Sequence, residues 1–347
     1  MKPFLLFILL ANFAFACSNN SNDNKSNKDT LPSLKGQYVH FTGNTQGTTF
    51  SIKYKIMTDS IKLPEFSALF NKVDNSMSEY VDSSIVSRIN RNDTTVRTDN
   101  LFNTVYKASV KVYKQTDGYF DITVAPLVKA WGFLPSAKIK LDQAKVDSLK
   151  QLVGMNKIKL VNNQIIKDDP RIQLDLNSIA QGFSVDYISI FLESKNITDY
   201  MVEIGGEVRT KGLNDKGELW KVGVDNPVGS EEDRGLQTIL ALSGKSVTTS
   251  GSYRKFFEEN GVKYSHTINP KTGYPTHHNL LSVSIIADCA TIADGYDTPI
   301  MVMGFEKGKE FVEKHPFLDA YFIYSDEKGE LKIWQSKGMA KYIVPSN

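Results

Sequence analysis

The sequence predicts an α+β fold, arranged as one two-lobed domain of mixed or antiparallel sheets with flanking helices. Its 347 residues are 41% hydrophobic, which suffices for a sizeable core. Runs rich in β-branched and aromatic residues, typical of strands, alternate with segments whose apolar residues recur at helical spacing. The alternation lacks the regular strand–helix–strand rhythm of a doubly wound parallel sheet, and the sequence contains no internal repeat.

Charge and motif content exclude two common function classes. The formal net charge is +2, with 41 basic and 39 acidic residues spread along the chain, so no basic face predicts binding to nucleic acid. The chain has neither the glycine-rich dinucleotide-binding fingerprint nor a Walker phosphate-binding sequence. Any recognition of phosphate must therefore be local.

The first residues have the pattern of a secretory signal. A basic start at Lys2 precedes an apolar run over 4–15, which is too short to span a bilayer as a mature helix. A small residue, Ala16, stands directly before Cys17. This arrangement resembles a bacterial lipoprotein signal over 1–16, in which the cysteine becomes the lipidated N-terminus.

A lipidated Cys17 would anchor the protein to the inner membrane on its periplasmic side. The polar residues of 17–36 are expected to form a flexible tether, and 37–347 the folded domain. The alternative is a cleaved signal followed by an incidental cysteine. The other cysteine, Cys289, is expected to be a small core residue, and a thiolate metal cluster is excluded by count, which leaves an oxygen-ligated cation open.

The first half of the domain predicts two strands and two helices. Strands are expected at 38–41 and 48–56, with Gly47 at the entry to the second, where a ligand could approach backbone amides. An amphipathic helix is expected over 64–79, started by a proline, and a second helix over 102–113.

The second half predicts more strands than helices. A helix is expected over 141–153, a hairpin over 157–167 that turns at Asn162-Asn163, and a strand that passes into a helix over 172–186. A strand-to-helix turn exposes amides that suit an anion. Further strands are expected at 201–209, 220–224, 236–242, 247–254, 280–287, 320–324 and 331–334.

Two neighbouring segments carry unusual polar chemistry. The segment 264–275 contains two prolines and a glycine, which predict a rigid loop, and its His266 and Lys271 could hold a phosphate-like ligand. Farther on, Asp294 and Thr298 are four residues apart, so a helix would place them on one face, able to share a hard cation. Singly, the histidine could be structural and Asp294 could cap a helix that starts there. The proximity of the two segments favours a functional site.

The motifs in these segments also resemble a known family. The pattern His266-x-x-x-Pro270-Lys271-Thr272-Gly273-x-Pro275, followed by Ala293-Asp294-x-x-x-Thr298, is similar to the signature of the ApbE family, the FAD:protein FMN transferases. Further matches lie at 78–90, 118–133, 172–186, 205–207 and 247–253, so the resemblance spans about 37–342. It implies an ApbE-like, T-fold-like architecture with FAD in a cleft.

The resemblance also implies roles for individual residues. Tyr80 would stack on the isoalloxazine ring, with a plain surface tyrosine as the alternative. Asp121 would accept from a ribose, ribityl or ring N–H group. Gln46 and Gln181 stand where the family has methionine and a charged residue. The full set is Gln46, Tyr80, Phe120, Asp121, Ile122, Asp175, Gln181 and His266 for FAD, Ser178, Asp294 and Thr298 for the metal, and His266 and Asp294 for catalysis.

The implied reaction is transfer of FMN from FAD to a threonine or serine hydroxyl of a target protein, leaving AMP. Attack on a pyrophosphate requires neutralised charge, which Mg²⁺ held by Asp294, Thr298 and an oxygen at Ser178 would supply. His266 is the expected base, with Asp297 an alternative base or ligand. Target flavoproteins are expected among membrane or periplasmic electron-transfer proteins. Two alternatives stay open, an FAD pyrophosphatase that forms FMN and AMP, and a non-catalytic flavin-binding lipoprotein.

Overall fold

The computed structural model describes most of the folded part of the chain. The described residues are 36–57, 60–134, 141–227, 235–251, 256–259, 262–265 and 267–345. The expected lipoprotein signal, Cys17 and nearly all of the expected tether lie outside them, as does His266. The described residues form one compact unit, in agreement with the expected single-domain fold.

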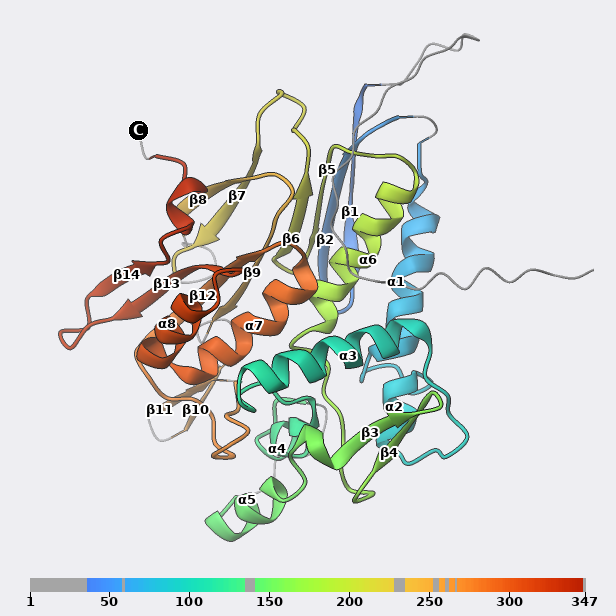
Figure 1. The fold of residues 1–347 in the computed structure, drawn as a ribbon, viewed down its shortest axis with the longest axis vertical. Coiled ribbons are helices and arrows are strands. Elements are labelled where there is room, and N and C mark those ends of the chain that lie inside the picture. Colours follow the sequence, from blue (N-terminus) through green and yellow to red (C-terminus); the bar gives the residue numbers. More distant parts are fainter. Residues whose placement is uncertain are drawn as a thin grey trace, which may run out of the picture. The chain divides into compact units, whose positions relative to one another are not determined.

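An antiparallel sheet of eight strands forms the centre of this unit (Figure 1). The order is β1-β2-β5-β6-β9-β12-β13-β14, and each neighbouring pair is antiparallel. The strands are β1 (Tyr38–Thr45), β2 (Thr48–Lys55), β5 (Tyr200–Ile204), β6 (Glu207–Lys211), β9 (Ser246–Gly251), β12 (Leu280–Ala287), β13 (Asp319–Ser325) and β14 (Leu331–Gln335).

Helices cover one face of the sheet. Helix α6 (Ala180–Ser194) packs on β5 and β6, α7 (Ala290–Met303) on β9 and β12, and α8 (Phe305–Lys314) on β13. Helix α1 (Leu63–Met77) packs beside α6 (Figure 1). The hairpin of β7 (Trp220–Asp225) and β8 (Leu236–Leu242) shares a separate apolar cluster with the sheet residues Val208, Val247 and Ile286.

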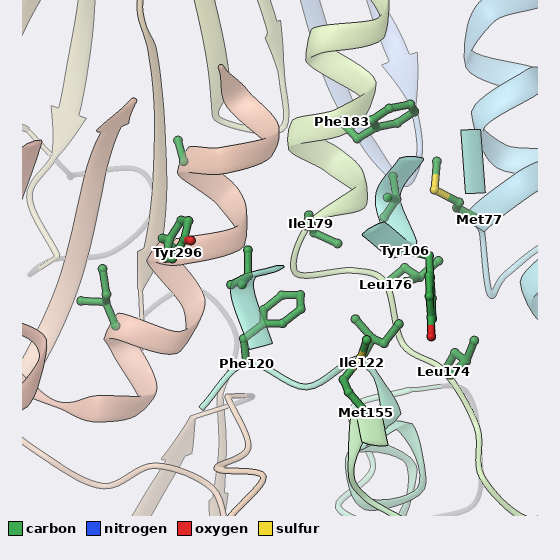
Figure 2. Packing of buried hydrophobic residues seen from close by; sticks show 14 of the residues in the cluster. Met77, Tyr106, Phe120, Ile122, Met155, Leu174, Leu176, Ile179, Phe183 and Tyr296 are labelled. Atoms are coloured by element: carbon green, nitrogen blue, oxygen red, sulfur yellow. The ribbon is translucent and has the colours of Figure 1, made fainter. Parts of the chain in front are cut away.

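Several elements outside the large sheet contribute to the apolar core beside α7. Helix α3 (Asn100–Gln115) lies against α7, and the apolar cluster between them includes Phe120, Ile122 and Tyr296 (Figure 2). The other elements are α2 (Ile85–Asn90), η1 (Ile122–Val124), α4 (Ala125–Ala130), α5 (Gln143–Lys150), η2 (Met155–Lys157), β3 (Ile158–Val161), β4 (Gln164–Lys167), β10 (Phe256–Glu259), β11 (Val262–Ser265) and η3 (Met339–Lys341). Of these, η3 contacts β13. None of the helices in the described ranges is both long and apolar enough to cross a bilayer.

Most expected elements are present, and the local turns follow from residue type. Asn162 and Asn163 both adopt positive φ, at 49° and 57°, and close the predicted β3–β4 hairpin. Gln46 and Gly47 do the same between β1 and β2, at 53° and 72°. The hairpin at Asn162-Asn163 is thereby confirmed, whereas the β1–β2 hairpin was not expected and β1 runs to Thr45, beyond the expected 38–41.

Two expectations and one open alternative were wrong in detail. Residues 172–177 form no strand, because Asn90 replaces a neighbouring strand: its Nδ2 donates to the Leu174 carbonyl at 2.9 Å and its Oδ1 accepts from the Leu174 N–H at 2.7 Å. Helix α5 is shorter than 141–153, since Asp142 caps its start by accepting from the Lys145 N–H. Asp294 does not cap a helix, because α7 begins at Ala290, a full turn earlier.

Candidate functional site

Asp294 is fixed at a close contact between α6 and α7. Its side chain is 5% exposed, and its Oδ2 accepts a hydrogen bond of 2.7 Å from the Gly182 N–H. Gly182 has no side chain, and a Cβ there would lie 2.4 Å from the Ala290 carbonyl oxygen and 2.6 Å from the Asp294 Cβ. The glycine therefore allows the amide of α6 to reach the carboxylate of α7.

A second buried carboxylate lies on the same helix. Asp297 is 2% exposed, and its Oδ1 accepts a 3.1 Å hydrogen bond from the Thr298 hydroxyl. Burial raises the pKa of Asp294 to about 7. Burial and then the charge of Asp294 raise the pKa of Asp297 well above its usual range. Two adjacent buried carboxylates resist being charged together, and a bound cation would remove that penalty.

The residues in this region fit a hard cation such as Mg²⁺. Their donors are carboxylate and hydroxyl oxygens, and Mg²⁺ needs only one or two carboxylates because it retains several waters. Ser178 lies on the segment leading into α6. Its neighbour Ile179 packs against α7, since a Cβ added to Gly295 would lie 3.3 Å from the Ile179 Cδ1. Among the described residues, no group of three or more His, Cys, Asp or Glu side chains gathers as ligands, so any site must include hydroxyl, main-chain or ligand oxygens. Asp297 lies beside the expected ligand pair of Asp294 and Thr298, through its hydrogen bond with the Thr298 hydroxyl.

Gln181 lies where α6 meets two hairpin turns. Its Nε2 donates to the Ile204 carbonyl at 2.9 Å, at the end of β5. A Cβ on Gly205 would lie 1.8 Å from this Nε2 and 2.9 Å from the Thr48 Cγ2, and Gly205 has a φ of 62°. The β5–β6 turn, the start of β2 and the start of α6 thus converge on Gln181.

Two carboxyl groups lie beside Tyr80: Asp175, which the sequence analysis assigned to FAD, and Glu79, which it missed. Both oxygens of Glu79 are buried and have no hydrogen bond of regular geometry within the described residues. Burial first, and then the charge of Asp175, raise the pKa of Glu79 to about 10, so Glu79 carries a proton at neutral pH. Asp175 accepts from the Asn177 N–H at 2.8 Å. Tyr80 is 63% exposed, and its stacking on a flavin stays a prediction.

The remaining residues expected to contact FAD differ in accessibility. The side chains of Phe120 and Ile122 are in the core, so any contact with a ligand would involve their main-chain atoms (Figure 2). The Oδ1 of Asp121 accepts from the N–H and the hydroxyl of Thr123, and its Oδ2 accepts from the Met155 N–H. These three assignments stay predictions.

Gln46 lies at the tip of the β1–β2 turn. Its Nε2 donates to the Asp74 Oδ1 of α1 at 3.1 Å, which ties the turn to the helix. Burial raises the pKa of Asp74, and the hydrogen bond from Gln46 opposes that shift. Gln46 therefore already has a protein partner, and its contact with FAD stays a prediction.

Hydrogen bonds and an ion pair hold the loop that follows His266, for which the sequence predicts a rigid backbone. Gly273 donates its N–H to the Asn269 carbonyl at 2.8 Å and accepts a hydrogen bond from the Trp131 Nε1 at 2.9 Å. Lys271 Nζ lies 2.7 Å from the Asp117 Oδ2 and 4.2 Å from the ring centre of Tyr119. The loop is therefore held against the 117–131 segment, which carries another of the recognised motifs.

Fold and site together define a class of protein that presents buried carboxylates, an exposed aromatic ring and a clamped basic loop on an antiparallel sheet covered by helices. Comparison with known proteins gives the family. The model of the ApbE family matches residues 46–322, and the chain belongs to that family.

Relatives and solved structures agree with this assignment. The FAD:protein FMN transferase of Vibrio cholerae is 36% identical over 302 residues, covering 84% of this chain and 89% of the relative. The protein of the same name from Haemophilus influenzae is 36% identical over 305 residues, covering 84% and 88%. The structure named "Flavin Transferase ApbE from Vibrio cholerae" has a TM-score of 0.79 at 33% identity, covering 88% of this chain and 99% of that one. The resemblance and the ApbE-like fold are thereby confirmed.

Proposed function

We propose that the protein transfers the FMN moiety of FAD to a threonine or serine hydroxyl of a target protein in a Mg²⁺-dependent reaction that releases AMP. The coarser statement, that the chain is an FAD:protein FMN transferase, rests on its membership in the ApbE family and on the names of its relatives. The observation that carries the finer proposal is the pair of buried carboxylates, Asp294 and Asp297, whose ionisation a cation would stabilise.

The proposed reaction exchanges one bond at phosphorus for another. The acceptor oxygen bonds to the FMN phosphorus, the bond from that phosphorus to the bridging oxygen breaks, and AMP leaves with the electron pair. The hydroxyl proton passes to a base. His266 is the proposed base because it stands directly before the loop that is held against the 117–131 segment. The product is a phosphoester-linked flavin on the target.

Asp294, Thr298 and an oxygen at Ser178 are the proposed metal ligands, with Asp297 as a neighbour that pairs with Thr298. When bound, Mg²⁺ neutralises the charge of the pyrophosphate and of the leaving AMP. The protein's own contribution is to hold the Asp294 carboxylate in one orientation through the Gly182 amide. A group fixed in advance requires no reorganisation during the reaction.

FAD is proposed to bind between the hairpin turns at Gln181 and the Tyr80 side chain. The exposed Tyr80 ring supports stacking with the isoalloxazine. The target proteins are proposed to be membrane or periplasmic electron-transfer proteins, since a lipidated Cys17 would place the domain at the periplasmic side of the inner membrane.

One incubation distinguishes this function from its alternatives. Purified protein is mixed with FAD, Mg²⁺ and a candidate target, and AMP and in-gel flavin fluorescence of the denatured target are measured. Transfer gives AMP together with a fluorescent target, a pyrophosphatase gives AMP and free FMN alone, and a flavin-binding protein gives neither. Asp294→Asn is expected to abolish transfer, whereas Asp288→Asn, an exposed residue just before α7 that pairs with Lys245, is the matched control and keeps it.

A further inference from the structure

The N-terminus of α7 is capped by another helix. Its own N-cap residue, Cys289, makes no capping hydrogen bond with its side chain. Asp186 of α6 accepts instead, with Oδ1 from the Ala290 N–H at 3.0 Å and with Oδ2 from the Thr291 N–H at 2.8 Å and from the Thr291 hydroxyl. These amides belong to the first turn of α7, where they have no partner within the helix, and a carboxylate is favoured there.

Asp186 is paired with Arg209 in this buried position. Asp186 is 4% exposed, and the Arg209 Nη1 lies 2.7 Å from its Oδ1. The Arg209 Nη2 lies 3.5 Å from Glu193 at the far end of α6, and Glu193 also accepts from the Tyr200 hydroxyl at 2.7 Å. A paired buried carboxylate that accepts several hydrogen bonds has its polar groups satisfied.

The contacts between α6 and α7 fall one helical turn apart on both helices. Gly182 donates to Asp294, and Asp186, four residues later, accepts from Ala290 and Thr291, which lie about one turn before Asp294. Two attachment points one turn apart fix both the rotation of α7 about its axis and its position along that axis. The orientation of the Asp294 carboxylate therefore depends on Asp186, although the two side chains share no hydrogen bond.

We propose that Asp186 is a positioning residue that sets the affinity of the Asp294 site for a divalent cation by holding the N-terminus of α7. The inference rests on the proposed function, which makes Asp294 a metal ligand. Asp186 does not contact the reacting groups. It acts through the backbone of α7, whose first amides it accepts from, and its charge also acts on Asp294 directly. Thr291→Val keeps that charge, so this variant separates the positioning effect from the charge effect. Loss of the groups that support metal ligands typically lowers metal affinity by about 10- to 100-fold. Because Asp186 acts through the helix, the lower end, about tenfold, is expected.

The test measures Mn²⁺ binding to the folded protein without FAD, by the loss of the free Mn²⁺ signal in electron paramagnetic resonance. Asp186→Asn replaces one acceptor oxygen by an NH₂ group, which cannot accept from the N–H groups of Ala290 and Thr291. This variant is expected to weaken Mn²⁺ binding about tenfold. The matched control is Glu193→Gln, which disturbs the same Arg209 network without touching α7. It is expected to lower the melting temperature while leaving Mn²⁺ affinity unchanged.

The transfer rate gives an independent readout. If Asp186 acts through metal affinity, excess Mg²⁺ restores the maximal rate of Asp186→Asn, which a general loss of structure would not allow. Should this variant not fold, Thr291→Val removes one of the bonds to Asp186 and keeps the charge pair, and a smaller weakening of Mn²⁺ binding is expected.

Two results would overturn the inference in different ways. Wild-type Mn²⁺ affinity in folded Asp186→Asn and Thr291→Val, with loss of binding in Asp294→Asn, rejects the positioning role and leaves the proposed metal site intact. Unchanged Mn²⁺ binding in Asp294→Asn rejects the metal assignment itself, as does absence of Mn²⁺ binding by the wild-type protein both without FAD and with it.

Discussion

Gly182→Ala tests the close contact between α6 and α7 most severely. The added Cβ would lie 2.4 Å from the Ala290 carbonyl oxygen, 2.8 Å from its carbonyl carbon and 2.6 Å from the Asp294 Cβ. An ordinary contact requires roughly 1 Å more, and two of the three atoms are backbone, so α7 must move. The helix-propensity gain of alanine, about 1 kcal/mol, opposes an overpacking cost of about 1–3 kcal/mol.

Net destabilisation of up to about 2 kcal/mol is therefore expected, which lowers the melting temperature by several degrees. Activity should fall much more than stability, because a displacement of about 1 Å near reacting groups can cost about 100-fold in rate. The assay follows fluorescent flavin on the target at a temperature where the variant is fully folded. The control is Gly308→Ala on α8, where a Cβ would meet Ile300 side-chain and main-chain atoms at 3.0 and 3.2 Å, so a shift of only a few tenths of an ångström is needed. A Gly182→Ala protein with the wild-type rate would refute the account of the helix contact.

Three further predictions follow from other parts of the molecule. Glu79→Gln should stabilise the protein at pH 8 and have little effect at pH 4. The pKa of Glu79 rises from 4.5 in the unfolded chain to about 10 in the fold. Ionisation of Glu79 therefore leaves the folding free energy unchanged below pH 4.5 and destabilises the fold by up to about 1.4 kcal/mol for each pH unit above it. Thermal melts at the two pH values check this, and an equal effect at both would show that Glu79 is ionised in the fold. His266→Ala should lower the maximal transfer rate more than the affinity for FAD, as kinetics and flavin-fluorescence titration can show, whereas a variant that only loses FAD binding would make His266 a binding residue. Cys17→Ser should release the protein into the soluble fraction with unchanged catalysis, and mass spectrometry that finds an unmodified Cys17 inside a longer mature N-terminus would reject the anchor.

Local chemistry explains what could be predicted from the sequence. The hairpin at Asn162-Asn163 and the rigid loop after His266 depend on residues whose backbone preferences act over a few positions. The four-residue spacing of Asp294 and Thr298 likewise indicated one face of a helix, and both residues lie in α7. Family motifs then brought the site residues together before any geometry was known.

Long-range contacts explain what could not be predicted. The expected strand at 172–177 failed because Asn90, 84 residues from Leu174, satisfies the backbone that a neighbouring strand would have satisfied. Glu79 stands next to Tyr80 in a recognised motif, yet its burial beside Asp175 depends on tertiary packing. The capping of α7 by Asp186 likewise joins residues more than 100 positions apart. Sequence patterns give no direct sign of such pairs.

The most direct measurement of the central claim is the ratio of AMP released to flavin covalently bound to the target, determined by chromatography and intact-protein mass spectrometry. The account predicts one AMP for each FMN-modified threonine or serine, with both products absent when Mg²⁺ is chelated or when Asp294 is replaced by Asn. AMP released without modification of the target, or covalent transfer that persists in chelator and in Asp294→Asn, would contradict it.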